Sequence, residues 1–335
     1  MKIGDHDTGE KVLVIAEIGN NHEGSYTLAE EMIGLAAAAG ASAVKFQTIV
    51  PNRLVSSRQK HRIQQLEKFR LGYDEFSRLS RVAKHENVMF LSTPFDCESA
   101  YFLESLTPAY KIASGDNNFY PLIEVVAKTG KPILLSTGLS DFSQVSYTRD
   151  FIFEIWKKSN INGELALMHC VTAYPTPPNE ANLLAIRTLK NLGMTVGYSD
   201  HVLGIEAAVL SVAVGARIVE KHFTLDKEYS EFRDHQLSAD PEEFKLMVER
   251  IQSTEELIGS GKKALQGCEK GFVEVARRSI VAARNMEKGE MITWNDISWV
   301  RPGGGMIPGN ESLLVGKRVL ESVAKGEPYT LDRVK

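Results

Sequence analysis

The sequence predicts a (β/α)8 barrel followed by a small β-rich domain, and three observations lead to this prediction. Short β-branched runs alternate with helical patterns from Val12 to about Ile258, which is typical of a parallel α/β sheet. Eight such runs can be counted, the number that closes this barrel. Each run begins apolar and turns polar at its end, and in this fold all eight strand ends converge on one mouth.

The eight expected strands are short and almost continuously apolar, as strands buried on both faces are. A doubly wound open sheet is the structural alternative, because it has the same alternation of strands and helices. In chain order the expected strands are Val12–Gly19, Ala43–Thr48, Val88–Phe95, Ala109–Gly115, Pro132–Gly138, Leu165–Val171, Thr195–His201 and Arg217–Thr224.

The intervals between these strands show helical periodicity. The first helix is expected between Ser25, whose side chain can cap it, and Gly40, which can end it. Glu30 and Glu31 are expected early in this helix, where the helix dipole favours anions. Later helices are expected at Tyr73–His85, Tyr120–Thr129, Phe142–Lys157, Glu180–Leu192, Ile205–Val214 and Pro241–Ile258.

The alternation stops after residue 258, so the barrel domain is expected to span residues 1–258, with a linker at 259–274. The remaining residues, 275–335, contain turn sequences such as Pro302-Gly303-Gly304-Gly305 between short apolar runs. A domain of about 60 residues is marginal alone, so we expect it to dock on a barrel. Its strands are expected at Ser279–Ala283, Ser298–Val300 and Arg318–Ser322.

Composition excludes several classes of protein. The net charge of -4 and the pI of about 6.1 argue against nucleic acid as a partner. Cys97, Cys170 and Cys268 have no CxxC spacing, so neither a disulfide framework nor a zinc knuckle is indicated. The N-terminus lacks the apolar region of a signal peptide, and no apolar run is long enough to span a bilayer. We therefore expect a cytoplasmic protein without membrane contacts.

Polar residues gather at the strand ends, where an active site is expected. Side chains alternate between the two faces of a strand, so Lys45 and Gln47 share one face and Ser199 and His201 share another. Lys221 is expected to point towards the helices. Charged residues are almost never fully buried unless paired, so this distribution indicates an enzyme. The polar positions are Glu17, Lys45, Gln47, Thr93, Lys111, Ser114, Ser136, His169, Ser199, His201, Glu220 and His222.

His201 and His222 end neighbouring strands, and adjacent strands lie about 4.8 Å apart. Both imidazoles can therefore reach one ion. Two imidazoles with open remaining positions suit a divalent metal that acts as a Lewis acid on a carbonyl group. The alternative is that one or both are hydrogen-bonded core histidines.

Lys45 and Lys111 are expected to project into the same mouth. Two ammonium groups there can bind a phosphate or a carboxylate, with Thr93, Ser114 and Ser199 as neutral donors. One alternative is a Schiff-base lysine, which needs a lowered pKa in a desolvated pocket. Another is an ion pair of either lysine with Glu17 or Asp116.

Two carboxylates complete the set. Glu17 ends the first strand and is the candidate general acid or base, or the anchor of a metal-bound water. Asp234 lies in the polar loop at 229–240 and is a candidate for binding substrate hydroxyl groups.

Nine motifs, eight at the strand ends and one in the C-terminal domain, resemble the sialic acid synthases, the phosphoenolpyruvate-condensing enzymes that make N-acetylneuraminate, legionaminate and pseudaminate. The resemblance runs through the whole chain and includes a C-terminal domain similar to the antifreeze-like, or SAF, domain. The motifs are EIGNNHEG (17–24), VKFQT (44–48), LSTPFD (91–96), YKIASGD (110–116), LLSTG (134–138), HCVTAYPTP (169–177), GYSDH (197–201), EKHFT (220–224) and VRPGGG (300–305).

The resemblance implies condensation of phosphoenolpyruvate with an N-acetylated hexosamine such as N-acetylmannosamine, giving a nine-carbon α-keto acid and phosphate. It implies that Lys45, Thr93, Lys111, Ser114 and Ser199 hold phosphoenolpyruvate. It also implies that His201 and His222 bind Mn2+ or Mg2+, which polarises the sugar aldehyde, and that Glu17 manages the proton or the metal-bound water. The residues implied on the acceptor side are Gln47, Asp116, Thr172, Tyr174, Asp234 and, from the partner subunit of a domain-swapped homodimer, Arg301.

Several positions depart from the neuraminate-making pattern, and they cluster on the acceptor side. Asp116 stands where glutamate is common, and Thr172 where asparagine or serine is common. The loop that usually reads GPDH is FRDH at 232–235. The segment 51–72 is long and basic and lacks a clear match to the sugar-binding asparagine of the family, and Arg277-Arg278-Ser279 replaces a more apolar entry to the last domain.

The same residues leave two alternatives to the synthase. One is a Schiff-base aldolase or lyase on the same barrel, which would use Lys45 or Lys111 covalently. The other is a non-catalytic carbohydrate-binding or scaffold protein. Binding alone does not need a converging set of cations and metal ligands, so this reading is the weakest.

Overall fold

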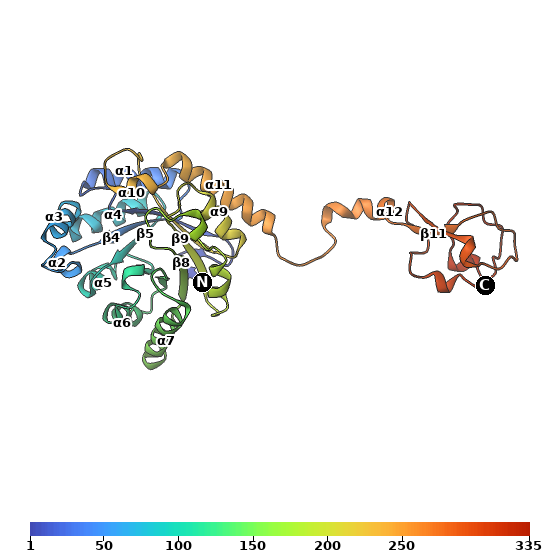
Figure 1. Cartoon of the computed structure of the whole chain (residues 1–335), viewed down its shortest axis with the longest axis horizontal. Helices are drawn as coiled ribbons and strands as arrows, with labels where there is room; N and C mark the ends of the chain where they lie inside the picture. Colours follow the sequence, from blue (N-terminus) through green and yellow to red (C-terminus); the bar gives the residue numbers. More distant parts are fainter. The chain divides into compact units, whose positions relative to one another are not determined.

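A computed structural model describes residues 1–335, apart from the side chain of Arg233. The chain divides into two compact units, Met1–Gly259 and Ser260–Lys335. Figure 1 colours the chain along its sequence and labels the helices and strands.

The first unit contains eight parallel strands in one sheet, hydrogen-bonded in the order β5-β4-β3-β10-β9-β8-β7-β6. The two end strands, β5 and β6, also contact each other, so the sheet closes into a ring. The predicted (β/α)8 barrel is therefore confirmed, and the open-sheet alternative is wrong. The strands are β3 (Leu13–Gly19), β4 (Ala43–Thr48), β5 (Met89–Pro94), β6 (Tyr110–Ile112), β7 (Ile133–Ser136), β8 (Leu165–Cys170), β9 (Thr195–Asp200) and β10 (Ile218–His222).

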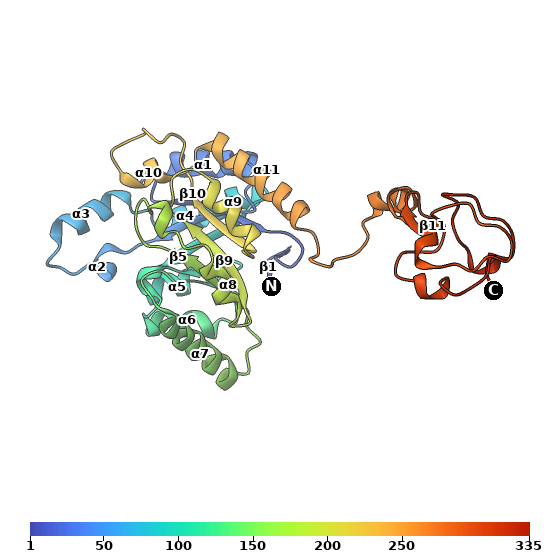
Figure 2. The same cartoon turned by 45° about the vertical axis from the view of Figure 1, so that its right-hand side comes forward.

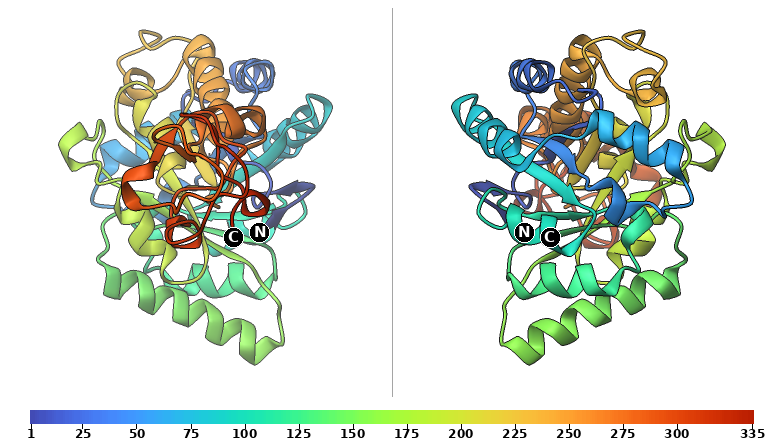
Figure 3. Two further views of the ribbon diagram at one scale, coloured as in Figure 1. Left: turned by 90° about the vertical axis from the view of Figure 1, so that its right-hand side faces the viewer. Right: turned by 90° about the vertical axis from the view of Figure 1, so that its left-hand side faces the viewer.

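Helices surround this ring, as Figure 1 shows, and α7 runs along its edge in both views of Figure 3. Figure 2 shows α2 and α3 at the side of the barrel. The helices are α1 (Tyr26–Ala38), α2 (Pro51–Leu54), α3 (Lys60–Phe69), α4 (Tyr73–His85), α5 (Cys97–Leu103), α6 (Tyr120–Lys128), α7 (Phe142–Ser159), α8 (Ala185–Lys190), α9 (Glu206–Ala213), α10 (Arg233–Leu237) and α11 (Pro241–Ile258).

The alternation of side chains divides the core into two parts. On β3, Val14, Ala16 and Ile18 belong to the larger core between the sheet and the helices. Leu13 and Ile15 point the other way, into the ring. The inner core is an apolar layer that closes the lower part of the barrel, and it consists of Ile3, Leu13, Ile15, Ala43, Leu91, Ala109, Leu134, Ala166, Met168 and Ile218.

Helix α1 shows how local sequence sets an element. The Ser25 side chain accepts a hydrogen bond from the backbone N–H of Leu28 and caps the helix. The chain leaves the helix through Gly40, whose φ of +91° suits glycine. Because the helix begins at Tyr26, Glu30 lies beyond the first turn, so the prediction of early acidic residues is wrong.

Several elements differ from the predictions. The strand expected at Ala109–Gly115 is only Tyr110–Ile112, because Ser114–Asp116 forms a 3-10 turn. The helix expected at Glu180–Leu192 is reduced to α8. Four short helices, α2, α3, α5 and α10, were not predicted, and neither was the N-terminal hairpin of β1 (Lys2–Ile3) and β2 (His6–Asp7).

The second unit has its own small core around an antiparallel pair, β11 (Ser279–Ala282) and β12 (Ile297–Val300). The strand predicted at Arg318–Ser322 is wrong, because only isolated bridges occur there. The unit begins with helical turns, η3 (Gly267–Phe272) and α12 (Val273–Ala276). The core residues are Ile280, Ala282, Met286, Ile292, Ile297, Leu314, Val319, Val323, Tyr329 and Val334.

Within the described residues, no helix combines the length and the apolar character that a bilayer-spanning helix requires.

Candidate active site

A polar layer lies directly above the apolar floor of the barrel. It is reached by moving two residues along each strand, which keeps a side chain on the same face. Ile15 is thus followed by Glu17, and Ile218 by Glu220. The layer consists of Glu17, Lys45, Thr93, Lys111, Ser136, Cys170, Ser199 and Glu220, and all eight side chains belong to buried residues.

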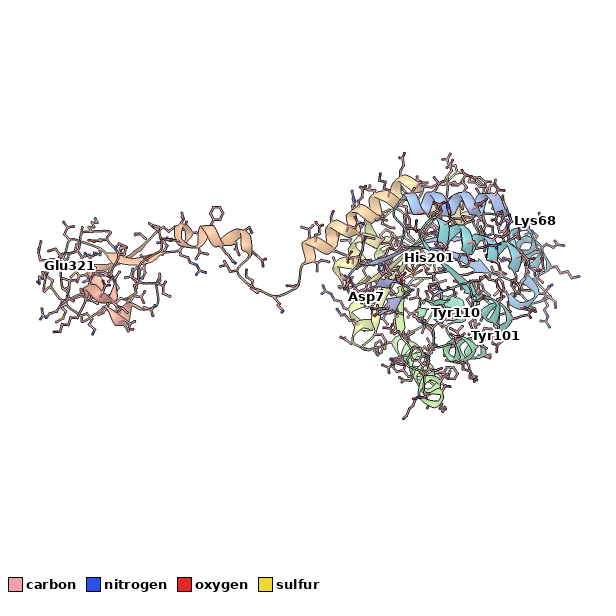
Figure 4. All side chains as sticks on the ribbon, turned by 180° about the vertical axis from the view of Figure 1, so that it is seen from behind. Asp7, Lys68, Tyr101, Tyr110, His201 and Glu321 are labelled. Carbon is pink, nitrogen blue, oxygen red and sulfur yellow. The ribbon has the colours of Figure 1, made fainter. Side chains whose placement is uncertain are left out.

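A cavity of about 520 Å³ opens above this layer. Figure 4 shows His201, one of its lining residues, near the middle of the barrel, with Tyr101 at the edge. Arg301 belongs to the second unit, where it is exposed, and its expected role stays a prediction. The other predicted site residues all line the cavity: Glu17, Lys45, Gln47, Thr93, Lys111, Ser114, Asp116, Thr172, Tyr174, Ser199, His201, His222 and Asp234.

Two lysines and two glutamates form a buried network at the base of the cavity. Lys45 Nζ lies 2.7 Å from Glu17 Oε2 and 3.8 Å from Glu220 Oε2. Lys111 Nζ lies 3.4 Å from Glu220 Oε1. Neutral hydroxyl groups support the network, since Lys45 donates to Thr93 Oγ1 and Ser199 donates to Glu220. The predicted pairing of Lys45 with Glu17 is present, whereas Lys111 pairs with Glu220.

Burial and charge set opposite pKa shifts in this network. Burial raises the pKa of Glu17, against the lowering effect of Lys45. Burial also acts to raise the pKa of Glu220, but Lys111 and Lys45 outweigh it and hold that pKa at about 2. Burial lowers the pKa of Lys111 despite Glu220. Glu220 is therefore the permanent anion of the network, and Glu17 is the carboxylate that is easier to protonate.

The two histidines lie side by side at the upper end of the cavity, with ring centroids 5.4 Å apart. His201 Nδ1 is 2.8 Å from the carbonyl oxygen of Val171, which places a proton on Nδ1. His222 Nδ1 is buried and has no hydrogen-bond partner among the described residues. Burial lowers the pKa of His222 well below its usual value, so its imidazole is neutral.

These two imidazoles fit a divalent metal as two ligands of an open site. Neutral imidazole nitrogen is a common metal ligand, and the carbonyl behind His201 is the kind of second partner that orients such a ligand. The described residues contain no group of three or more His, Cys, Asp or Glu side chains arranged around one ion. The remaining coordination positions would therefore fall to water or substrate.

Other lining residues of the cavity combine amides with carboxylates. Gln47 donates to Glu17 Oε1 at 2.9 Å, and Asn20 donates to Gln47 Oε1 at 3.0 Å. Burial raises the pKa of Asp116 to about 6. The Thr172 hydroxyl is buried without a partner in the described chain, so it can bind a further polar group.

Sequence reasoning missed some lining residues and misplaced one. Cys170 lies at the base of the cavity with its Sγ 3.7 Å from His201 Nδ1, and the period-2 pattern from Met168 would have placed it there. Glu220 was expected to face inward but was not assigned to the site. His169 was grouped with the mouth, yet it faces outward and contacts the carbonyl oxygen of Ala181 at 2.8 Å.

Comparison with known proteins places the chain in a family. The model of the NeuB family matches residues 32–263, and that of the SAF domain matches residues 277–335. The chain is 34% identical to an N,N'-diacetyllegionaminic acid synthase of Campylobacter jejuni, over 95% of this chain and 98% of that protein. It is 35% identical to a pseudaminic acid synthase of the same species, over 98% of both.

A solved structure supports the same relationship. The N-acetylneuraminic acid synthetase of Leptospira borgpetersenii, crystallised with citrate, aligns with a TM-score of 0.76 and 34% identity. The alignment covers 82% of this chain and 95% of that one. With a barrel that gathers buried lysines and paired histidines around one cavity, and with these matches along its length, the chain belongs to the NeuB family of sialic-acid-synthase-type transferases.

Proposed function

We propose that the chain condenses phosphoenolpyruvate with an N-acetylated hexosamine to give a nine-carbon sialic-acid-like α-keto acid and phosphate. C3 of the enol phosphate attacks the aldehyde carbon of the sugar, and the aldehyde oxygen takes up a proton. Water adds at C2, and the C2–O bond to phosphate breaks. One C–C bond is thus formed, one water is consumed and one phosphate is released.

The observation that carries this proposal is the pair of buried lysines beside the two histidines in a single cavity. Lys45 and Lys111 would hold the phosphate and carboxylate of phosphoenolpyruvate, with Thr93, Ser114 and Ser199 as neutral donors. Glu220 holds both lysines at the base of the cavity, within 3.8 Å and 3.4 Å. Fixed cations in a water-poor site stabilise charge that develops on the departing phosphate.

His201 and His222 would hold the divalent metal, Mn2+ or Mg2+. When bound, this ion supplies Lewis-acid polarisation of the sugar aldehyde. The chain's own part is to present His201 with its Nδ1 proton committed to the Val171 carbonyl, and His222 as a neutral imidazole.

Glu17 would handle the proton. Its carboxylate lies between Lys45 and Gln47, at 2.7 Å and 2.9 Å, and its pKa is raised by burial. A general base works best when its pKa approaches the working pH, so a raised carboxylate suits removal of a proton from the attacking water. Gln47, Asp116, Thr172, Tyr174 and Asp234 would contact the acceptor sugar.

The proposal extends to the assembly and the surroundings. The second unit would pack over the barrel of a partner subunit in a domain-swapped homodimer, where Arg301 would grip the N-acetyl group of the acceptor. The cytoplasm, where phosphoenolpyruvate is available, would be the compartment.

The test is phosphate release by the full-length protein with phosphoenolpyruvate, N-acetylmannosamine and Mn2+. We expect release only when all three are present, and loss of release after a chelator is added. His222→Gln should behave like the chelated protein. Release of phosphate without sugar would contradict the proposal.

Borohydride trapping with pyruvate separates this reaction from a Schiff-base aldolase. Lys111 is the lysine to watch, because burial lowers its pKa, whereas the carboxylates around Lys45 raise that of Lys45 against its burial. We expect no covalent label on Lys111 by mass spectrometry. Labelling there, together with metal-independent turnover, would support the aldolase.

A further inference from the structure

One cation that lines the cavity has no part in the proposed site. Arg62 of α3 is an exposed residue that contributes to the lining, which places it at the opening of the cavity. Its Nη1 donates to Gln65 Oε1 at 2.7 Å, three residues further along the same helix. Among the described residues, the Arg62 guanidinium forms no ion pair, so its charge is available to a ligand.

The segment around Arg62 is strongly basic, although the chain as a whole is acidic. Residues 53–70 contain six lysine or arginine residues and a single carboxylate, that of Glu67, in a chain with a net charge of -4. A basic rim on an acidic protein concentrates positive potential at the opening of a cavity, which raises the local concentration of an anionic substrate and its rate of entry. The six cationic residues are Arg53, Arg58, Lys60, Arg62, Lys68 and Arg70.

Contacts at both ends hold this basic segment against the barrel, at the side where Figure 2 shows α2 and α3. At one end, Arg53 Nη1 lies 3.2 Å from Asp96 Oδ1, and Nη2 of the same side chain donates to Glu98 at the start of α5. At the other end, the ring of Phe69 packs edge-on against that of Phe232, with centroids 5.0 Å apart. Arg62 lies between these anchors, so its place at the opening is set before a ligand arrives.

The lysines at the base of the cavity carry no surplus positive charge. Lys45 pairs with Glu17, and Lys111 pairs with Glu220. Phosphoenolpyruvate has a carboxylate and a phosphate, which together carry a charge of about -2.5 to -3 at pH 7. This anion must pass the opening before it can compete with the two glutamates for the lysines. A guanidinium at the opening can bind its phosphate through two parallel N–H···O bonds, a geometry that an ammonium group lacks.

We propose that Arg62 forms an anion-capture site at the opening of the cavity, which binds the phosphate of phosphoenolpyruvate before Lys45 and Lys111 receive it. The choice of phosphoenolpyruvate as the anion rests on the proposed condensation. Capture is non-covalent and precedes the formation of the C–C bond. Arg62 therefore acts on the affinity for phosphoenolpyruvate and its rate of entry, and it leaves the neutral acceptor sugar to other residues.

The experiment measures binding of phosphoenolpyruvate to the full-length protein by isothermal titration calorimetry. Arg62→Gln should raise Kd about tenfold at about 0.01 M salt, the effect of losing one hydrogen bond to a charged group. The loss should become smaller at about 0.1 M salt, because the Debye length falls from roughly 30 Å to roughly 10 Å. Arg62→Lys keeps the charge without the two parallel bonds and should retain part of the affinity. Equal Kd values for the wild-type protein and Arg62→Gln would overturn the inference.

Lys68→Gln is the matched control, because it removes the same charge from the same helix. Lys68 is exposed but does not line the cavity, and Figure 4 shows it at the edge of the barrel, away from His201. We expect Lys68→Gln to leave Kd almost unchanged at about 0.1 M salt, where exposed charges that lie further apart than the Debye length are largely screened. Equal losses in Arg62→Gln and Lys68→Gln would show that only the overall charge matters and would overturn the capture site.

Turnover separates this inference from the proposed condensation. With N-acetylmannosamine and Mn2+, Arg62→Gln should lower kcat/KM for phosphoenolpyruvate about tenfold and leave KM for the sugar unchanged. A raised KM for the sugar, with unchanged binding of phosphoenolpyruvate, would overturn the capture site and leave the condensation intact. Phosphate release without sugar would overturn the condensation, whereas a calorimetric loss confined to Arg62→Gln would still support the anion site.

Discussion

Buried pairs of lysine and carboxylate occur on both faces of the barrel strands, but their surroundings differ. On the outer face, Lys221 Nζ lies 3.0 Å from Asp200 Oδ2 and also donates to the carbonyl oxygen of Val202. The other oxygen of Asp200 accepts from the Tyr198 hydroxyl at 3.0 Å and from the Val202 N–H at 2.9 Å. Neither residue lines the cavity, and both are buried in the packing between the sheet and its helices.

On the inner face, the charges border open space. Lys45 and Lys111 share Glu220, and both line the cavity. The polar atoms His222 Nδ1 and Thr172 Oγ1 are buried there without partners in the described chain. Burial and pairing alone therefore do not distinguish a structural ion pair from a binding site. What distinguishes them is whether every polar atom is satisfied by the protein itself.

The largest expected effect concerns the outer pair. Lys221→Met should lower the free energy of unfolding by about 3–5 kcal/mol, because it leaves the Asp200 carboxylate buried without its cation. Urea denaturation at pH 7 measures this loss. The double variant Lys221→Met with Asp200→Leu is the control and should recover much of the stability. A loss below about 1 kcal/mol in the single variant would remove the contrast between the faces.

The inner pair should respond in the opposite way. Lys111→Met should reduce kcat by about 10²–10³-fold, the usual effect of removing one preorganised charge from an active site. Its stability should change by less than about 2 kcal/mol, because Glu220 keeps Lys45 and the Ser199 hydroxyl. Phosphate release and urea denaturation on the same preparation test both statements. A fully active Lys111→Met enzyme would contradict the site.

The contrast between the faces also shows which features the sequence could predict. Alternation along the strands predicted that Glu220 faces inward and Lys221 outward, and the structure confirms both. It succeeded because a strand has a fixed period, so one assigned residue fixes its neighbours. It failed at Ala109–Gly115, where the strand ends after Ile112 and Ser114 enters the cavity from a 3-10 turn.

The part of the cavity lining formed by Leu54 and Phe232 could not be predicted, because contacts between distant segments of the chain create it. Only Leu66 of α3 is buried, so this helix has little core packing of its own. The helix is held at its end by Phe69 against Phe232, two residues far apart in the sequence. Gly24 permits this arrangement, because a Cβ there would lie 2.1 Å from the carbonyl oxygen of Lys68.

Asp116 provides a smaller test of the inner face, because its Oδ2 is buried there without a hydrogen-bond partner in the described chain. Its pKa is raised from 3.8 to about 6 by burial, so the folded protein binds more protons than the unfolded chain between these values. Ionised Asp116 therefore destabilises the fold at pH 7, and this cost disappears as the pH falls through 6 towards 4. After allowance for its partial exposure, Asp116→Asn should stabilise the protein by about 1–2 kcal/mol at pH 7 and by almost nothing at pH 4. A gain that does not depend on pH would contradict this origin.

The smallest expected effect concerns Glu23, which binds Ser230 and His235 of the loop after β10. Burial lowers the pKa of His235, although Glu23 acts to raise it, so the imidazole is neutral at pH 7. The contact of His235 with Glu23 is then a hydrogen bond and not an ion pair. Glu23→Gln keeps an oxygen acceptor for His235 and Ser230 and should cost at most about 0.5 kcal/mol at pH 7, whereas Glu23→Ala should cost about 1 kcal/mol.

Acidic pH separates these possibilities further. Protonation of His235 turns the contact into an ion pair in the wild-type protein but not in Glu23→Gln, so the stability difference between them should grow as the pH is lowered from 7 through the pKa of His235. Thermal unfolding of the two proteins across this range measures it. If Glu23→Gln lost as much stability as Glu23→Ala at pH 7, the contact of His235 with Glu23 would be an ion pair. It would then resemble the pair of Lys221 and Asp200 more than a neutral hydrogen bond.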